Sequence, residues 1–486
     1  MNTAFRFLCS CLYSAAFAFC ILTRDQNEND DSTTQKYVPY ISGSILPAFL
    51  LIWSIVGFIT AGMEETFQLI LSLCFGIFLH ISLYYIILLP LMPFLRRHIS
   101  SRACSMLWLL PNYLYICHQS YMSLSSPRFV IHIPTDIIWI LFYIWLTGFI
   151  IVFLWKIISH IMFRRHVLYN SYIVRDPDTL KCMTNEIEKA RLKYKNYKLF
   201  ISPIIETPFS IGLFKRTTCI ILPKKNYTSE ELTLIFRHEI IHIGREDAWS
   251  KFFSMFCTAV CWFNPLMWIA MRKSADDMEL SCDESVLLDA ADTERQHYAS
   301  LILKTAGDER GFTTCLSASA KALRYRLQNI VSIRKKHSGA GIVGIISFLL
   351  FMSYGYISLA YEYHTGAEMI YQGENPDSCI IEDIDVSNDI YSKNYYCTDM
   401  NAFHEYMTDL SFYSITGNYD PSEYDHCLSI DYRSAKGGIM WVSLYDHTIE
   451  LSTFEDGDVH SVTYYLSEST DWDYLMSILV DDPVLG

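Results

Sequence analysis

Long apolar runs constrain the fold of this chain more than any other feature of its sequence. They lie at about residues 4–22, 41–62, 68–94, 104–121, 134–158 and 341–361. Most of them approach the roughly 20 residues that a helix needs to cross the hydrocarbon core of a bilayer. With 51% hydrophobic residues and a mean hydropathy of +0.18, the chain is too apolar for an ordinary soluble enzyme. We therefore predict a multi-span α-helical membrane protein.

Two of the runs need separate interpretation. The run at 104–121 is interrupted by Pro111 and Asn112, which leaves five and six spans both open. The first run could be mistaken for a signal peptide, but no convincing small-residue cleavage site precedes the polar stretch at 23–36. We interpret the first run as a membrane span.

Basic side chains near the ends of the runs indicate the orientation, because lysine and arginine are enriched on the cytoplasmic side of membrane proteins. They are Arg96, Arg97 and Arg102 after the third run, Lys156, Arg164 and Arg165 after the fifth, and Arg334, Lys335 and Lys336 before the last. The segment between the last two clusters is therefore expected in the cytosol. Without a crossing at 104–121 the first cluster would lie outside, so the charges favour six spans.

These boundaries predict four parts of a multi-pass plasma-membrane protein. They are an N-terminal transmembrane region at 1–158, a cytosolic domain at 159–340, a final transmembrane helix at 341–361 and an extracellular part at 362–486. We call this last part the C-terminal domain. The long cytosolic and extracellular segments are where a soluble function is expected.

The cytosolic segment contains the sequence 238-HEIIH-242. Two histidines four residues apart on a helix project from one face and can bind the same ion. Glu239 lies between them, where it can take a proton from a zinc-bound water. This is the arrangement of a zinc peptidase, but the motif also arises by chance, so its surroundings decide its meaning.

The residues before the motif predict the helix that it requires. Thr228 and Glu231 have the spacing of a capping box, which begins a helix. Apolar residues then recur at helical spacing, at Leu232, Ile235, Phe236, Ile240 and Ile243. Both histidines are therefore expected on one helix.

Zinc in a peptidase needs a third protein ligand and keeps its fourth position for water. We expect Glu279, in 276-DDMELSCDESV-286, to be that ligand. Asp283, four residues later, is expected to accept the outer N–H of a ligand histidine. A solvated acidic helix start is the simpler alternative for the same residues. Cys282 is a further candidate near the metal, although a small buried hydrophobe is the commoner role of such a cysteine.

The apolar stretch at 252–271 tests this set of ligands. If the stretch crossed the membrane once, Glu279 and the two histidines would lie on opposite sides and could not share a metal ion. We expect instead a buried helix, an interfacial segment or a hairpin that turns near Asn264 and Pro265.

The soluble part before the motif has the pattern of an α+β domain. Asp176 and Pro177 have the character of an N-cap and a first-turn proline, and they predict a helix that reaches about Lys193. Two short β-like runs follow at 198–205 and 217–222.

Several separated motifs in this segment resemble, in the same order, those of the BlaR/MecR-type integral-membrane metallopeptidases. The motifs are 202-SP-203, 207-TPF-209, 212-GLF-214, 220-IILP-223, the HEIIH helix, Asp247, 262-WFNPL-266 and 279-ELSCDE-284. The similarity covers roughly residues 68–335. It implies a cytosolic gluzincin-like peptidase domain that binds one Zn²⁺ through His238, His242 and Glu279. By the same resemblance, Glu239 is the general base.

The resemblance also implies how such a peptidase is used. In the best-known relatives a β-lactam is the signal outside the cell, and the peptidase then inactivates a DNA-binding repressor. The expected function is therefore a signal transducer that cleaves a cytosolic repressor, its own basic region at 307–337, or both. Cleavage by a neighbouring copy would require a homodimer. The 217–222 run is expected, by resemblance, at the sheet edge that pairs with substrate, with a plain core strand as the alternative.

The C-terminal domain differs in composition from the rest of the chain. It holds 25 Asp and Glu against three Lys and Arg, which is more than the whole formal charge of −14. Such a domain will not bind nucleic acid or anionic lipid directly without a cation. Alternating runs at 427–432, 439–445 and 460–466 predict a small, mainly antiparallel β domain, with helices near 402–411 and 471–480.

This domain also departs from the drug-sensing relatives, which carry a penicillin-binding domain acylated at the serine of an S-x-x-K motif. Its only lysines, Lys393 and Lys436, have Ile390 and Arg433 at the serine position. Sensing of β-lactams by acylation is therefore not expected. Two other functions stay open: a membrane-protein quality-control peptidase, and a receptor whose peptidase domain is a relic. A relic, however, would tolerate the loss of Glu239.

Overall fold

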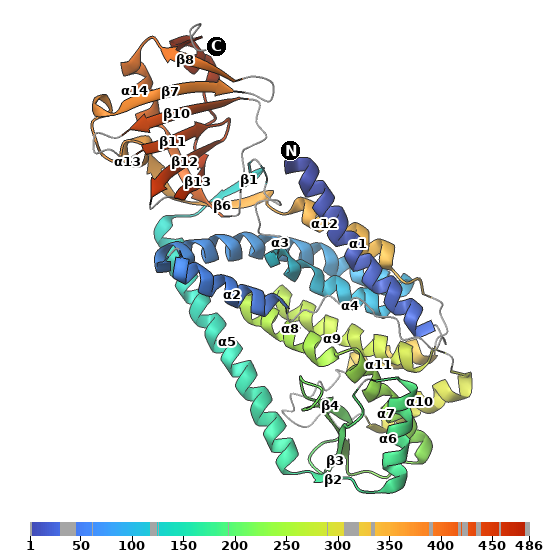
Figure 1. Cartoon of the computed structure of the whole chain (residues 1–486). Helices are drawn as coiled ribbons and strands as arrows, with labels where there is room; N and C mark the ends of the chain where they lie inside the picture. The colour runs from blue at the N-terminus through green and yellow to red at the C-terminus, as the bar shows by residue number, and fades with distance from the viewer. Residues whose placement is uncertain are drawn as a thin grey trace.

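The computed structural model describes residues 2–29, 45–60, 62–116, 124, 126–192, 194–288, 290–305, 320–331, 336–387, 392–416, 419, 426–433, 439–455 and 458–481. Figure 1 shows three parts in a row: a twisted sheet at one end, long helices in the middle and a small α+β domain at the other end. The first helix begins at the end of the helical part that faces the large sheet. The two soluble parts are therefore separated by the apolar helices.

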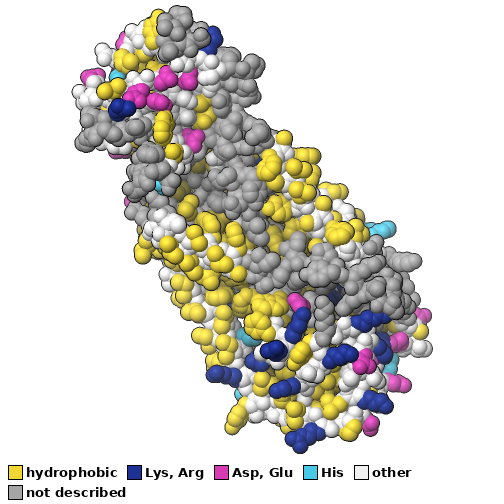
Figure 2. Space-filling model, in the orientation of Figure 1, with side chains coloured by type: hydrophobic (Ala, Val, Ile, Leu, Met, Phe, Trp, Pro, Cys, Tyr) yellow, Lys and Arg dark blue, Asp and Glu magenta, His cyan; other side chains and the backbone are white. Residues whose placement is uncertain are grey.

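The middle part contains most of the apolar runs as helices. They are α1 (Asn2–Asn29), α2 (Ile45–Thr60), α3 (Gly62–His98), α5 (Thr135–Tyr169) and α12 (Ala340–Ser353). Among the described residues, three segments are long and apolar enough to cross a membrane: Ala4–Thr23, Thr66–His98 and Thr135–Tyr169. Hydrophobic side chains also cover much of the visible surface of this part (Figure 2). Such a surface belongs in lipid, so the chain is a membrane protein.

The run at 104–121 does not form one continuous α-helix. It begins as α4 (Ser101–Leu109) and continues as a 3₁₀ helix, η1 (Leu110–Ile116). The change coincides with Pro111, which has no N–H to bond the carbonyl of Leu107. That carbonyl instead accepts a 2.7 Å hydrogen bond from the Tyr84 hydroxyl of α3. The irregular backbone is thus satisfied by its neighbour, as the interior of a membrane protein requires.

The last apolar run, predicted as a transmembrane helix over 341–361, is helical only as far as Ser353. Its second half is strand β6 (Ile357–Thr365), and Gly355 at φ +87° lies between helix and strand. This half leaves the helix because its backbone pairs with β9 (Ser411–Ile415) on one side and with a strand from residues 129–132 on the other. The C-terminal domain therefore begins before residue 362.

The C-terminal domain is built on a ten-stranded sheet with the order β1-β6-β9-β13-β12-β11-β10-β7-β8-β14. Its remaining strands are β7 (Ile380–Ser387), β8 (Ser392–Cys397), β10 (Cys427–Arg433), β11 (Ile439–Leu444), β12 (Thr448–Glu455), β13 (Asp458–Leu466) and β14 (Leu479–Asp481). The added helices are α13 (Gly366–Met369), α14 (Met400–Asp409) and α15 (Trp472–Ile478), with the 3₁₀ turn η3 (Pro376–Ser378). Phe403 and Met407 of α14 and Leu475 of α15 are buried against the sheet. The predicted strands and both predicted helices of this domain are confirmed.

One strand of this sheet comes from the N-terminal half of the chain. β1 (Phe129–His132) pairs in parallel with β6, in the register Phe129↔Ile357 to His132↔Ala360. The indole N–H of Trp139, in the first turns of α5, also donates a 2.9 Å hydrogen bond to Glu362 Oε1. The loop before α5 is therefore an integral part of the C-terminal sheet, which the sequence did not predict.

The small α+β domain contains a four-stranded sheet with the order β2-β3-β5-β4. Its strands are β2 (Tyr172–Ile173), β3 (Lys198–Ser202), β4 (Phe209–Ile211) and β5 (Cys219–Pro223). All five residues of β5 are buried, and it pairs with β3 on one side and β4 on the other. The expectation that 217–222 is the edge strand was therefore wrong, because β4, which precedes it in the chain, pairs with it and forms the edge. The alternative, a core strand, is correct.

The helices of this domain bring distant parts of the sequence together. They are α6 (Pro177–Lys189), α7 (Ser229–Gly244), α8 (Asp247–Val260), α9 (Pro265–Val286), α10 (Asp292–Thr305) and α11 (Ala320–Val331). The apolar stretch at 252–271 forms the hairpin between α8 and α9, and the Asn264 side chain caps α9 by accepting from Leu266 N. Because the stretch turns back, Glu279 lies on the same side as the histidines.

Candidate metal centre

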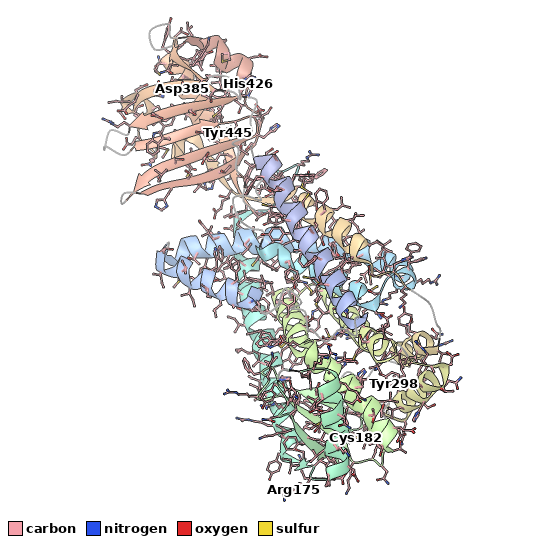
Figure 3. All side chains as sticks on the ribbon, turned by 45° about the vertical axis from the view of Figure 1, so that its right-hand side comes forward. Arg175, Cys182, Tyr298, Asp385, His426 and Tyr445 are labelled. Atoms are coloured by element: carbon pink, nitrogen blue, oxygen red, sulfur yellow. The ribbon has the colours of Figure 1, made fainter. Side chains whose placement is uncertain are left out.

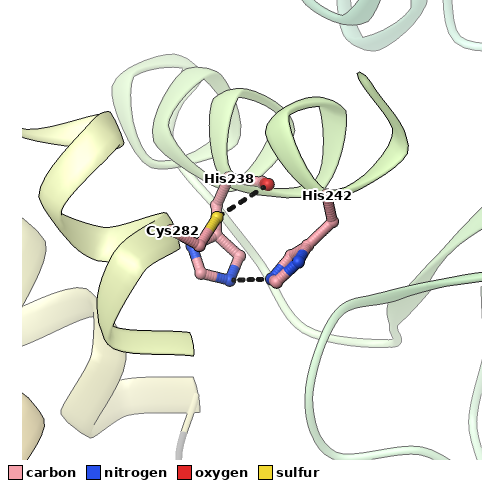
Figure 4. Close-up of side chains that lie close together, drawn as sticks. All are labelled: His238, His242 and Cys282. Atoms are coloured by element: carbon pink, nitrogen blue, oxygen red, sulfur yellow. Dashed lines mark hydrogen bonds between the residues drawn. The ribbon is translucent and has the colours of Figure 1, made fainter. Parts of the chain in front are cut away.

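Helix α7 places the two histidines of the motif next to each other. The predicted capping box is confirmed: Thr228 Oγ1 accepts from Glu231 N at 3.2 Å, and a Glu231 carboxylate oxygen accepts from Thr228 N at 2.8 Å. His238 and His242 follow on one face, and their Nε2 atoms are 3.1 Å apart (Figure 4). The capping box stabilises the start of the helix, and the spacing of four residues brings both rings to one face.

Helix α9 brings two further donors to these rings. Glu279 Oε2 lies 3.6 Å from His238 Nε2 and 3.5 Å from His242 Nε2. The sulfur of Cys282 also lies close, and it forms with the two histidines a group whose donor atoms are all within 4.8 Å of one another. Cys282 is fully buried and its Sγ contacts the His238 carbonyl oxygen at 3.4 Å (Figure 4). The sequence underrated this cysteine as a neighbour of the site.

The ring of His242 is oriented by a carboxylate from its own segment. Its Nδ1 lies 2.7 Å from Oδ2 of Asp247, the first residue of α8. Both side chains are largely buried, with 8% and 6% of their surface exposed. An Nδ1–H donated to Asp247 leaves Nε2 free to bind a cation. Asp247 is one of the positions that carry the family resemblance, but no role was predicted for it.

The ring of His238 is oriented through a tyrosine that was not among the predicted site residues. Asp283 was expected to accept directly from a histidine, but its Oδ1 lies 3.6 Å from His238 Nδ1. The hydroxyl of Tyr298, on α10 (Figure 3), lies 2.9 Å from His238 Nδ1 and donates a 2.8 Å hydrogen bond to Asp283 Oδ1. Asp283 thus acts on the ring through Tyr298, and it is also bonded to Arg326 of α11.

The electrostatics of the cluster favour ionised donors. Burial would raise the pKa of Glu279, but His242, Lys251 and His238 hold it well below its usual range. Burial would also raise the pKa of Cys282, and the two histidines lower it instead. Although burial lowers the pKa of His238, Cys282 and Glu279 raise it to about 10. The lowered pKa values of Glu279 and Cys282 favour the deprotonated forms in which carboxyl and thiol groups bind metal ions.

Comparison with known proteins places this geometry in a family. The sequence model of the BlaR1 peptidase M56 family matches residues 128–330, the stretch that holds every residue of the cluster. This stretch therefore resembles the BlaR1 peptidase M56 family. The regulatory protein BlaR1 of Bacillus licheniformis is 27% identical over 209 residues, which are 43% of this chain and 32% of that protein. The chain thus matches about a third of the length of this relative.

The M56 assignment confirms the predicted family and indicates a metallopeptidase domain in a membrane protein. His238, His242 and Cys282 could hold a metal ion, and Glu279 lies beside them. The ligand set itself stays a prediction. No role was predicted from the sequence for three residues that support the site: Asp247, Tyr298 and Arg326. Of these, only Asp247 is among the positions that carry the family resemblance.

The M56 site opens into a large cleft. The cleft has a volume of about 2650 Å³ and is lined by parts of α3, α5, α7, α8, α9 and α11. His238, Glu239 and Glu279 line it, and so do all three residues of β4, which ends the small sheet. Lys and Arg side chains gather on the visible face of this end of the molecule (Figure 2). The candidate site is therefore open to the surface of the domain through this cleft.

Proposed function

We propose that this chain is a membrane-bound zinc endopeptidase that transduces an extracellular signal by cleaving itself, a cytosolic transcriptional repressor, or both. The observation that carries the proposal is the meeting of Glu279 with both histidines of the HEIIH motif, 37 residues further along the chain. A solvated acidic helix start would not bring this carboxylate to the rings. The M56 family match supports the same activity.

The donor atoms fit a zinc ion. Ligand atoms about 2.0–2.1 Å from a tetrahedral zinc lie roughly 3.3 Å from one another. The separations among His238 Nε2, His242 Nε2 and Glu279 Oε2 are 3.1, 3.5 and 3.6 Å. We assign these three as the ligands, because two histidines and a glutamate leave the fourth position open for water in catalytic sites. Cys282 is the alternative third ligand.

The residues of the site have distinct roles in the proposed reaction. Bound zinc would polarise the scissile carbonyl and activate a water molecule. Glu239, which is buried on α7 and lines the cleft, takes the proton of the attacking water and passes it to the leaving amine. Asp247 and Tyr298 accept the Nδ1–H groups of the histidines and so keep both Nε2 atoms directed at the ion.

Strand β4 is the best candidate for binding the substrate backbone. It pairs with β5 on one side only, at the end of the sheet order of the described strands. An extended peptide lying in the cleft can add to the other side of β4 as a further strand. The gluzincin-like peptidases that the chain resembles use an edge strand in this way. The proposed role therefore moves from 217–222 to Phe209–Ile211.

The proposed sidedness places the C-terminal domain outside the cell and the M56 site in the cytosol. Two contacts support a consistent assignment of sides. β1 lies in the same sheet as the C-terminal strands, so the loop before α5 is on their side. Arg96, in the last turn of α3, is 2.8 Å from Asp277 of α9, so the basic cluster after the third run is on the side of the metal site. Both agree with the six-span orientation.

The first test replaces the general base alone. Glu239→Gln is expected to retain about one zinc per chain, measured by mass spectrometry of the purified protein. Cleavage of labelled casein should fall by roughly 10²–10⁴-fold, since a general base contributes that much. Glu230→Gln is the matched control, because Glu230 lies in the first turn of the same helix with 85% of its side chain exposed. Normal cleavage by Glu239→Gln would refute the role of Glu239.

The second test concerns the substrate. Of the predicted self-cleavage region 307–337, residues 307–319 and 332–335 lie outside the described part of the chain. A C-terminally tagged chain in lipid nanodiscs with zinc should release a tagged fragment that begins within 307–337. The fragment should be absent from Glu239→Gln. Equal amounts of fragment from both proteins would show that another protease makes the cut, and self-cleavage would be excluded.

A further inference from the structure

Arg326 lies on α11 and contacts the proposed metal centre. Its Nε and Nη2 atoms each donate a 2.8 Å hydrogen bond to one oxygen of the Asp283 carboxylate, and its Nη1 lies 3.9 Å from Glu279 Oε2. The side chain of Arg326 is 18% exposed and that of Asp283 is 3% exposed. A planar guanidinium bonded at two points fixes the orientation of a carboxylate, which the point charge of a lysine does not.

The contact continues to a histidine of the motif. Asp283 Oδ1, which Arg326 holds, also accepts the hydroxyl of Tyr298, and that hydroxyl lies 2.9 Å from His238 Nδ1. Without Arg326 the buried Asp283 would lose its paired cation and the two hydrogen bonds that fix its orientation. A reoriented carboxylate moves the acceptor of Tyr298, and through Tyr298 the His238 ring.

Helix α11 has other attachments that do not depend on this guanidinium. Ile330 is buried, and Leu323 and Leu327 pack against the same hydrophobic core as the HEIIH helix. The Tyr325 ring also lies 5.8 Å from the guanidinium carbon of Arg96. Substitution of Arg326 is therefore expected to leave α11 folded and docked, so that its effect is confined to the site.

We propose that Arg326 is a positioning residue, which holds His238 through Asp283 and Tyr298 and makes the geometry of the metal centre depend on how α11 is docked. The inference rests on the proposed peptidase function. Helix α11 precedes α12 in the chain, and α12 leads into strand β6 of the C-terminal sheet. A displacement of α12 that shifts α11 therefore reaches the metal centre through Arg326, without any change in the ligands themselves.

The experiment uses the full-length protein in lipid nanodiscs and measures zinc retention against a competing chelator, together with kcat and KM for labelled casein. Arg326→Gln should bind zinc roughly 2–10-fold more weakly and lower kcat, because its effect reaches His238 through the hydrogen-bonded hydroxyl of Tyr298. KM should change less than kcat, because Arg326 acts on the metal centre through Asp283. The zinc affinity and kcat of Arg326→Lys should lie between those of the wild type and Arg326→Gln.

Two matched variants separate this role from simple charge effects. Arg324→Gln removes an exposed cation from the same helix, and Lys336→Gln removes the 2.8 Å ion pair to Glu284, the residue after Asp283. Both should keep wild-type zinc retention. If either variant matches Arg326→Gln, the effect is one of general charge and the proposal is wrong.

A double variant tests the route through Asp283. If Arg326 acts through Asp283, Arg326→Gln should add nothing to Asp283→Asn, whereas independent effects would add. Additive losses, or wild-type zinc retention and kcat in Arg326→Gln, would overturn the proposal. If Arg326→Gln fails to fold, Arg326→Lys and Asp283→Asn give the same comparison. An inactive Glu239→Gln together with a normal Arg326→Gln would refute this inference alone, and an active Glu239→Gln would refute the function on which it rests.

Discussion

The two histidines of the motif are held from opposite directions. His242 is oriented by Asp247, five residues later in the same segment, at 2.7 Å. His238 is oriented by Tyr298 of α10, which depends in turn on Asp283 of α9 and Arg326 of α11. The His242 half of the site is therefore formed within α7 and the start of α8. The His238 half forms only when α9, α10 and α11 pack against α7.

This difference predicts where the site can be controlled. A local contact changes little when other parts of the molecule move, because its two partners share one short segment. A contact assembled from α9, α10 and α11 changes whenever one of these helices shifts. The His238 half is therefore the sensitive half of the site, and the three predictions below test the two halves from the largest expected effect to the smallest.

The largest effect is expected where both halves meet, at the third ligand. Glu279→Gln should lose zinc on dialysis, and its casein cleavage should fall by more than the roughly 10–100-fold expected for an outer partner. Cys282→Ala should retain zinc, because Glu279 completes the site without the thiol. Metal analysis of the two purified variants distinguishes them. Zinc loss from Cys282→Ala but not from Glu279→Gln would make the cysteine the ligand.

A smaller effect is expected from the local half. Asp247→Asn removes the charge that accepts from His242 Nδ1 but preserves the shape of the side chain. Zinc affinity should fall by roughly 10–100-fold. The control is Asp178→Asn, an exposed change in the first turn of α6. If Asp247→Asn retains wild-type affinity in a chelator competition, the ring of His242 needs no local support.

The smallest effect is expected from Tyr298→Phe, which removes one hydroxyl between His238 and Asp283. The hydrogen bond between this hydroxyl and His238 contributes about 0.5–1.5 kcal/mol, so zinc affinity and kcat should fall by roughly 2–10-fold. Thermal unfolding monitored by circular dichroism provides the control for folding. A loss larger than that of Asp247→Asn would reverse the order and make the remote half the main support of the site.

The helix that carries both histidines could be predicted from the sequence because its signals are local. The spacing of the two histidines, the capping box at Thr228 and the apolar phase of α7 all lie within one helix. The hairpin at Asn264 followed from a physical constraint, since Glu279 had to return to the same side. These features needed no knowledge of which distant elements pack together.

The remote half could not be predicted in the same way. Tyr298 stands in a helix with no pattern that marks a polar contact, and Arg326 lies in a basic segment whose charge alone explains its place beside a membrane span. Only tertiary packing brings them to Asp283. The same holds for β4, a three-residue strand too short for a sequence signal, and for β1, whose partner β6 is more than 200 residues away.

The pairing of β1 with β6 has a mechanical consequence. Helix α5 starts at Thr135, just after β1, and leads down to the M56 site, whereas α12 leads back up and ends at Ser353, just before β6. The segment from α5 to α12 thus has both of its ends hydrogen-bonded to each other in the C-terminal sheet. A movement of that sheet is therefore transmitted to α5 and α12 together. The two helices can tilt or twist relative to each other, but their ends at the sheet cannot move apart.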